Sequence, residues 1–315
     1  MSSSRAMCCA TSSFARRPAL PRPAEFSFDP DVTPLRIPSP EGRQMTDQTQ
    51  AAETPAVTLS LDRGVAVLEI RNPAKRNAVS YGMWVAMAEH LAGLRDMKPG
   101  ELHAVVVRGH GERAFVSGAD LSEFNEARSG TEGPKRYDAA VEAASAALEA
   151  MPVPTIALIH GACIGAGMGV ALACDLRYAD ERATFGIPAA RLGIGYHETG
   201  VRRLVDAIGA APARELLMTA KRYDAAAAKA MGLVNAVLPV DALDGHVEAI
   251  LDTLRENAPL SIRASKCSVR AATRPEDAAA VTAARTAIAA CNGSADYAEG
   301  LAALTGRRAP VFTGN

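Results

Sequence analysis

Small residues gather at residues 161–169, where a β-branched run ends and an apolar stretch begins. Gly161, Gly165, Gly167 and Gly169 carry no side chains there, so the backbone can closely approach another chain segment or a ligand. A strand that turns into the start of a helix also directs free N–H groups toward whatever lies beside it. Such donors could hold the negative charge that develops on a carbonyl oxygen, which is the chemistry of an oxyanion hole.

These small residues have a second explanation, which is tight packing of a buried helix against a sheet. A nucleotide-binding loop is excluded, because the glycines lack the G-x-G-x-x-G spacing and no G-K-[ST] follows. A second turn favours the oxyanion hole. The apolar run at 114–116 is typical of a short strand and stops at Ser117-Gly118, so that an N–H donor could project from Ala119. Two donors on two separate turns are what an oxyanion hole requires.

Several motifs occur in a specific order and spacing. They are RNPAKRNA at 71–78, SGAD at 117–120, HGACIGAGMG at 160–169, CD at 174–175, ATFG at 183–186, GLVN at 232–235 and EG at 299–300. From Val57 to Phe312 the chain thereby resembles the crotonase (enoyl-CoA hydratase/isomerase) superfamily. The resemblance implies a bent coenzyme A thioester whose acyl oxygen meets the N–H groups of Ala119 and Ala166.

The same resemblance exposes a departure from the hydratases of the superfamily. Those enzymes use two glutamates to position and activate the water that adds to the double bond. One of these positions, three residues after the oxyanion glycine, is Gly169 here, and the other, after the F-G-x-P turn, is Ala189. Neither residue can move a proton, so we expect no hydration that depends on this pair.

Three groups able to bond or to transfer a proton stand in a row at Tyr196, His197 and Glu198. The resemblance places their loop over the reacting carbons. The methylmalonyl-CoA decarboxylase branch has a Tyr at the position of Tyr196, near the substrate carboxylate, but a His where this chain has Ala119. In some isomerases one carboxylate from this loop moves the proton, a role open to Glu198 or His197. Structural roles are the alternative: a pocket cap, a surface histidine and a helix-start carboxylate.

Contacts with coenzyme A are predicted from the resemblance, and coenzyme A is expected as part of the substrate, with no metal and no permanently bound cofactor. Arg76 or Lys75 could face a phosphate, although charged turn residues are more often solvated. The predicted contact residues are Arg76, Asn77, Ala78, Gly118, Asp120, Leu121 and Gly165. Outside this set, we interpret Arg202 and Arg203 as solvated residues or subunit contacts and His160 as structural.

Three functions remain open at this point. The first is an acyl-CoA enzyme of the enoyl-CoA hydratase/isomerase type that stabilises a thioester enolate and uses a residue of the 192–200 loop for proton transfer. The second is a decarboxylase of malonyl-type thioesters, which needs an oxyanion hole but not the missing glutamates. The third is a non-catalytic acyl-CoA binding protein.

The elements that must position these residues alternate between strands and helices, which predicts a layered α/β core. Strands are expected at 57–62, 65–70, 104–108, 155–159, 176–179 and 184–186, with helices at 81–96 and 134–150. From Gly200 onward nearly everything is predicted to be helical. The resemblance specifies this further as a crotonase-like ββα spiral core with a C-terminal α-helical trimerisation region, and hence a homotrimer or homohexamer.

Composition limits the class of protein. With 315 residues, 48% of them hydrophobic, the chain can bury a large core, and a formal charge of −1 argues against nucleic acid as a partner. The longest apolar stretch, 156–173, is interrupted by His160 and glycines, which argues against a membrane span. Six cysteines without paired C-x-x-C spacing favour reduced thiols in the cytoplasm.

Three regions are expected along the chain. Residues 1–50 are acid-poor at the start and rich in Ser and Pro, which predicts a disordered leader. It is either a transit peptide or a mis-assigned start, and the second is favoured because prolines at 18, 21 and 23 would break an amphipathic helix. Residues 51–255 are predicted to form the spiral core and residues 256–315 the helical region.

Overall fold

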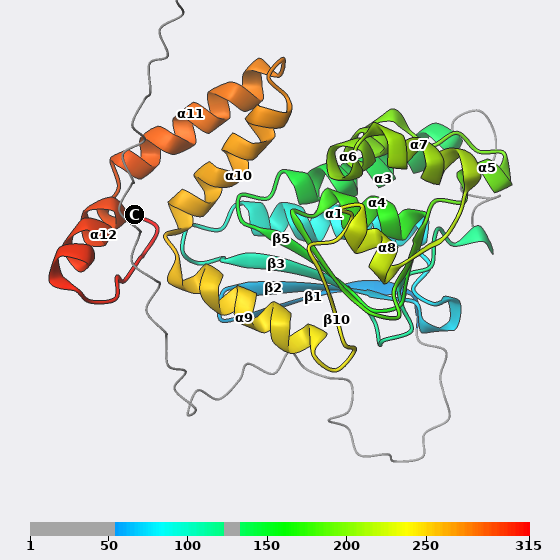
Figure 1. The fold of residues 1–315 in the computed structure, drawn as a ribbon, viewed down its shortest axis with the longest axis horizontal. Coiled ribbons are helices and arrows are strands. Elements are labelled where there is room, and N and C mark those ends of the chain that lie inside the picture. The colour runs from blue at the N-terminus through cyan, green and yellow to red at the C-terminus, as the bar shows by residue number, and fades with distance from the viewer. Residues whose placement is uncertain (1–53, 123–132) are drawn as a thin grey trace, which may run out of the picture. The chain divides into compact units, whose positions relative to one another are not determined.

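The computed structural model describes residues 54–122 and 133–315, so the predicted leader at 1–50 lies outside the described residues. A six-stranded sheet runs through the core in the order β1-β2-β3-β5-β7-β10 (Figure 1). Its strands are β1 (Ala56–Asp62), β2 (Val65–Arg71), β3 (Ala104–Gly109), β5 (Thr155–Ile159), β7 (Leu176–Asp180) and β10 (Ala236–Leu238). The first two strands form an antiparallel hairpin and the others pair in parallel.

Both faces of this sheet are buried, because side chains alternate between two hydrophobic clusters. In β3, Val105 and Val107 belong to the larger cluster, whereas Val106 belongs to the smaller one. Helix α1 (Tyr81–Arg95) packs in the larger cluster, while α9 (Leu243–Glu256) covers the opposite face with Leu243, Val247 and Leu251 (Figure 1). Because both faces of the sheet are covered, its central strands β3 and β5 carry apolar residues at consecutive positions rather than only at alternate ones.

A second, four-stranded sheet carries the small-residue segment. Its order is β4-β6-β8-β9, formed by β4 (Ala114–Val116), β6 (Ala162–Ile164), β8 (Thr184–Gly186) and β9 (Tyr223–Asp224). Strand β6 was not anticipated, since the sequence pattern favoured a direct turn from β5 into a helix. Its residues pair in parallel with both β4 and β8, which shows that pairing partners from distant segments make this strand.

The remaining helices are α3 (Gly133–Glu149), α4 (Ala166–Ala173), α5 (Ala189–Leu192), α6 (Glu198–Ile208), α7 (Ala210–Thr219), α8 (Ala225–Ala230), α10 (Pro259–Thr273), α11 (Ala278–Asn292) and α12 (Ala295–Gly306). Among them, α3 and α4 were predicted, whereas the short α5 was not, and α6 begins two residues before the predicted start at Gly200. Beyond residue 200 the expectation of nearly continuous helix missed β9 and β10. Strand β10 is short and is defined by its parallel pairing with β7, which no local pattern reveals. None of the helices in the described ranges has the length and hydropathy to cross a bilayer.

Candidate active site

The two turns predicted to form an oxyanion hole lie against each other. Strands β4 and β6 are parallel neighbours, so their carboxyl ends deliver Gly118 and Gly165 to the same place. A Cβ atom added to Gly165 would lie 3.8 Å from the Cα of Gly118. Both glycines have positive φ angles, 135° and 55°, a conformation that other residues rarely adopt. The structure therefore places Ala119 and Ala166, the residues that follow them, in adjacent turns.

The backbone pairing around Ala119 and Ala166 leaves their N–H groups available. Val79 donates to the carbonyl of Gly118 and accepts from the N–H of Asp120, each at 2.9 Å, so the N–H between these two bonds points away from Val79. Ala166 is the first residue of α4, where an N–H has no acceptor within the helix. Among the described residues neither N–H has an acceptor in the protein.

Packing explains two other glycines of the segment. A Cβ atom on Gly161 would lie 2.3 Å from the carbonyl oxygen of Arg113, and one on Gly167 would lie 2.5 Å from that of Val116. These contacts are too short for any side chain. Close packing, one of the two explanations open from the sequence, thus applies to Gly161 and Gly167, whereas Gly165 belongs to the paired turns.

Gly169 faces the hydroxyl group of Tyr196. A Cβ atom at Gly169 would lie 3.7 Å from the Tyr196 Oη, and one at Gly200 would lie 2.8 Å from the Cε1 of the same ring. The tyrosine is half-buried, and its burial raises the pKa of its hydroxyl to about 12. In the part of the chain that the structure describes, this hydroxyl forms no hydrogen bond, so near neutral pH it is a protonated, unengaged donor.

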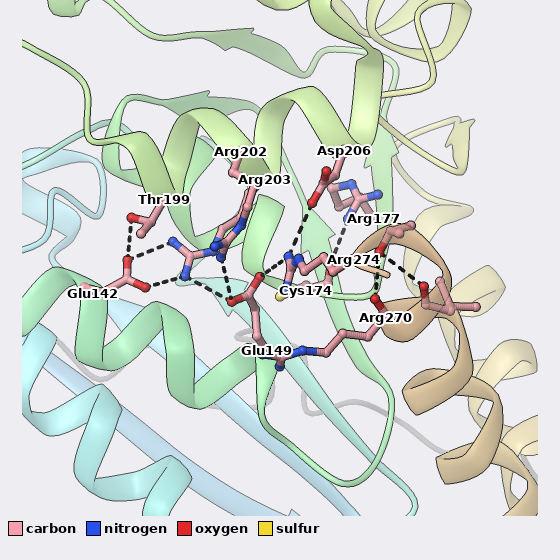
Figure 2. A network of polar contacts seen from close by, with 12 residues as sticks. Glu142, Glu149, Cys174, Arg177, Thr199, Arg202, Arg203, Asp206, Arg270 and Arg274 are labelled. Carbon is pink, nitrogen blue, oxygen red and sulfur yellow. Dashed lines mark hydrogen bonds and ion pairs between the residues drawn. The ribbon is translucent and has the colours of Figure 1, made fainter. Parts of the chain in front are cut away.

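A network of charged residues holds the helix that follows this loop (Figure 2). Arg203 donates to Glu142 Oε1 at 2.8 Å and to Glu149 Oε2 at 3.1 Å, with its side chain only 4% exposed. Burial disfavours the charge on Glu142, but hydrogen bonds from Arg203 and Thr199 outweigh it and lower the pKa of that carboxyl. The interpretation of Arg203 as a solvated or subunit residue was therefore wrong, whereas its neighbour Arg202 is 45% exposed.

Comparisons with known proteins identify the family of this chain. Residues 60–315 match the family model described as enoyl-CoA hydratase/isomerase. The chain belongs to the enoyl-CoA hydratase/isomerase family. It is 30% identical to rat mitochondrial methylglutaconyl-CoA hydratase over 80% of each chain, and 29% identical to the crotonyl-CoA hydratase of Syntrophomonas wolfei over 81% of this chain and 97% of that one.

Solved structures agree with this assignment. An enoyl-CoA hydratase/carnithine racemase from Magnetospirillum magneticum has a TM-score of 0.77 and 32% identity, covering 82% of this chain and 96% of that one. Enoyl-CoA hydratase from Bacillus anthracis has a TM-score of 0.76 and 27% identity, covering 82% and 99%. The predicted crotonase-superfamily membership and α/β fold class are confirmed. As a member of the enoyl-CoA hydratase/isomerase family, the chain is related to acyl-CoA-processing enzymes.

The other two loop residues of this enoyl-CoA hydratase/isomerase family member lie in different surroundings from Tyr196. His197 is exposed, and its Nε2 lies 3.1 Å from the Oδ2 of Asp138 in α3. Glu198 is exposed at the first residue of α6, where a helix N-terminus favours a carboxylate. Of the three groups that the sequence offered, the hydroxyl of Tyr196 is the one that the structure brings to Gly169.

The residues predicted to contact coenzyme A divide into engaged and accessible groups. The buried amide of Asn77 donates to the carbonyls of His110 and Ala114 and accepts from the N–H of Asn72, so its side chain holds the turn together. Arg76 and Leu121 are exposed, Ala78 is buried, and Gly118 and Gly165 form the paired turns. Residue type alone does not separate these roles, because charged and polar turn residues look alike whether they are engaged or solvated.

Asp120 also has a structural partner. The Nζ of Lys75 lies 2.8 Å from Asp120 Oδ2, and Lys75 also donates to Ser122. Desolvation opposes ionisation of Asp120, but the hydrogen bonds from Lys75 and Ser122 prevail and lower its pKa. The ammonium group that could have faced a phosphate is therefore paired within the protein.

His160 is structural, as expected. It is buried, its Nδ1 lies 2.9 Å from Asp180 and its Nε2 lies 2.9 Å from Asp244. Burial opposes the charged imidazolium, but these two carboxylates prevail and raise the pKa of His160 to about 9. The charged ring thus ties α9 to the carboxyl ends of β5 and β7.

A separate cleft of about 1050 Å³ lies between the C-terminal helices α10 and α11 and the core. One bridge across it runs from the Nζ of Lys266, which donates to Asp175 at 2.7 Å and to the carbonyl of Val153 at 3.0 Å. Another joins Arg274 to Glu149 and Asp206 (Figure 2). Its lining residues include none from the turns at Gly118 and Gly165.

Proposed function

We propose that this protein is an acyl-CoA enzyme that stabilises a thioester enolate between the N–H groups of Ala119 and Ala166. The observation that carries the proposal is the contact between the turns at Gly118 and Gly165, with both following N–H groups unengaged by the described residues. Fixed donors aimed at a developing oxyanion are commonly the largest single contribution to such reactions. The site supports lyase or isomerase chemistry, which proceeds through an enolate.

In this proposal Tyr196 supplies the proton. Its hydroxyl lies beside Gly169, the position at which the resemblance expects a hydratase glutamate, and its raised pKa keeps it protonated near neutral pH. When water adds to the double bond of an enoyl thioester, Tyr196 donates its proton to the enolate carbon. The tyrosinate then takes up the proton that the added water releases. Glu198 and His197, to which the sequence left proton transfer open, are tested beside it because both lie in the same loop.

Decarboxylation of a malonyl-type thioester is the second candidate. The missing carboxylates at Gly169 and Ala189 do not stand against it, because decarboxylation needs an oxyanion hole but not the two glutamates. Cleavage of the C–C bond releases CO₂ and leaves the electron pair as an enolate, which the oxyanion hole would hold until a proton reaches the carbon. A non-catalytic acyl-CoA binding protein is the remaining alternative.

Coenzyme A is bound, in this proposal, as part of the substrate along the turns at 71–78 and 117–121. Asn77 would contribute through its backbone carbonyl, since its side-chain amide and its N–H are both engaged, while exposed Arg76 is free to approach a phosphate. We further propose a cytoplasmic homotrimer or homohexamer. Support comes from the cleft beside α10 and from the exposed apolar side chains Val269 and Leu304, which a neighbouring subunit would cover.

Incubation of the purified protein with crotonyl-CoA, a 3-enoyl-CoA and methylmalonyl-CoA, followed by mass spectrometry and chromatography of the thioesters, tests these proposals. Gain of water indicates hydration, a shifted double bond indicates isomerisation, and loss of CO₂ indicates decarboxylation. Ala166→Pro removes one oxyanion donor at a helix position that tolerates proline, so we expect kcat to fall about 10²–10³-fold with the fold retained.

Three further variants assign the proton donor. Tyr196→Phe is expected to abolish most turnover, while Glu198→Ala and His197→Ala retain it. Turnover that survives in Tyr196→Phe and disappears in Glu198→Ala would transfer the role to Glu198. If all three thioesters bind to the protein and none changes, the non-catalytic alternative stands.

A further inference from the structure

The loop that carries Tyr196 has little backbone support of its own. The N–H of Ile194 donates to the carbonyl of Ala189, and the next backbone bond is from Val201 to His197. Within the described ranges, the N–H groups of Gly195, Tyr196 and His197 have no backbone acceptor. Side chains must therefore fix the conformation of this segment.

Helix α3 provides these side chains from one face. Asp138, Glu142 and Glu149 are spaced by four and seven residues, which places them on the same side of the helix. Asp138 contacts His197, and Glu142 accepts a hydrogen bond from the Oγ1 of Thr199 at 2.8 Å. Going along α3 from Asp138 to Glu149, the partner residues are met in the same order along the loop and α6, from His197 to Arg203.

We propose that Thr199 and Glu142 are positioning residues that hold the hydroxyl of Tyr196 at the acyl site; this rests on the proposed function. Glu142 binds Thr199 and Arg203 together, which lie one turn apart in α6 (Figure 2). Gly200, between them, lies against the ring of Tyr196, with its added Cβ only 2.8 Å away. A shift of this first turn would therefore move the ring.

Glu149 offers a matched comparison within the same network. Like Glu142 it accepts a hydrogen bond from Arg203, at 3.1 Å, and it also pairs with Arg274. It makes no contact with Thr199 among the described residues, since Thr199 Oγ1 bonds to Glu142. A general loss of stability from this network would thus affect both glutamates, whereas a positioning effect would be confined to Glu142 and Thr199.

Steady-state kinetics of Thr199→Val, Thr199→Ser and Glu149→Gln test the proposal. Thr199→Val keeps the side-chain shape and removes the hydroxyl, so we expect kcat to fall about tenfold or more with KM almost unchanged. Thr199→Ser should restore kcat, and Glu149→Gln should leave it nearly unchanged. In a Tyr196→Phe background, Thr199→Val should have no further effect, because the positioned group is gone.

A second readout does not depend on turnover. In protein labelled with 3-fluorotyrosine, the ¹⁹F resonance of Tyr196 is assigned by its disappearance in Tyr196→Phe. We expect this resonance to shift or broaden in Thr199→Val and Glu142→Gln but not in Glu149→Gln. An unchanged resonance in Thr199→Val, or an equal change in all three variants, would overturn the positioning role. A wild-type protein without turnover would instead refute the proposed function, with this readout still valid.

Discussion

The two sides of the candidate site are built in different ways. The turns at Gly118 and Gly165 are positioned by backbone contacts. Glycines there let β4, β6 and α4 approach one another more closely than side chains would allow. The loop at Tyr196 is positioned by side chains, through Thr199, Glu142 and the buried Arg203. We therefore expect the two glycine turns to be disrupted by added side-chain atoms, and the Tyr196 loop to be disrupted by loss of a charged or hydrogen-bonding side chain.

This difference explains which side the sequence revealed. A backbone-built turn requires particular small residues at particular positions, so its requirements are visible in the chain itself. A loop fixed by ion pairs depends on partners more than fifty residues away, and charged residues look alike in a sequence whether they are buried or solvated.

Arg203→Leu should destabilise the protein by about 3 kcal/mol, because it removes the buried guanidinium that bonds both Glu142 and Glu149. The matched change, Arg202→Leu, should have an effect below about 1 kcal/mol, since Arg202 is 45% exposed and 3.9 Å from Glu149. Urea unfolding of both variants measures the difference. Equal losses would show that the loop side of the site does not depend on the buried arginine.

Gly167→Ala should destabilise the protein by about 1–3 kcal/mol, because the new Cβ would lie 2.5 Å from the carbonyl oxygen of Val116. Gly169→Ala, in the same helix, meets only an ordinary contact of 3.7 Å and should gain up to about 1 kcal/mol from helix propensity. Thermal unfolding compares the two. A stabilised Gly167→Ala variant would contradict the close backbone packing assigned to this side.

The charged His160 should make stability fall as the pH rises. The pKa of His160 is about 9 in the folded protein. At a pH between the ordinary histidine pKa of about 6.5 and this value, the folded chain retains a proton that the unfolded chain has lost. The stabilisation is complete below about pH 6.5 and decreases toward pH 9, by about 1 kcal/mol between pH 7 and pH 8. Urea unfolding at these pH values measures it, and a His160→Gln variant should lack this component of the slope.

Much of the core was predictable because its signals are local. The apolar runs predicted β3 and β5, and the helical pattern predicted α1 and α3, each to within one or two residues of the observed bounds. Strands β6, β9 and β10 were missed, since two or three residues form a strand only when a neighbouring strand supplies the hydrogen bonds. Their partners come from distant parts of the chain.

The sequence by itself determined the family, the two glycine turns and the lack of carboxylates at Gly169 and Ala189, because each depends on residue type at a fixed spacing. Only the tertiary structure decided that Tyr196 reaches Gly169 and that Arg203, rather than Arg202, is buried. The physical reason is that burial and ion pairing arise between segments. A hydroxyl or guanidinium acquires its environment, and hence its pKa and its role, only when those segments pack together.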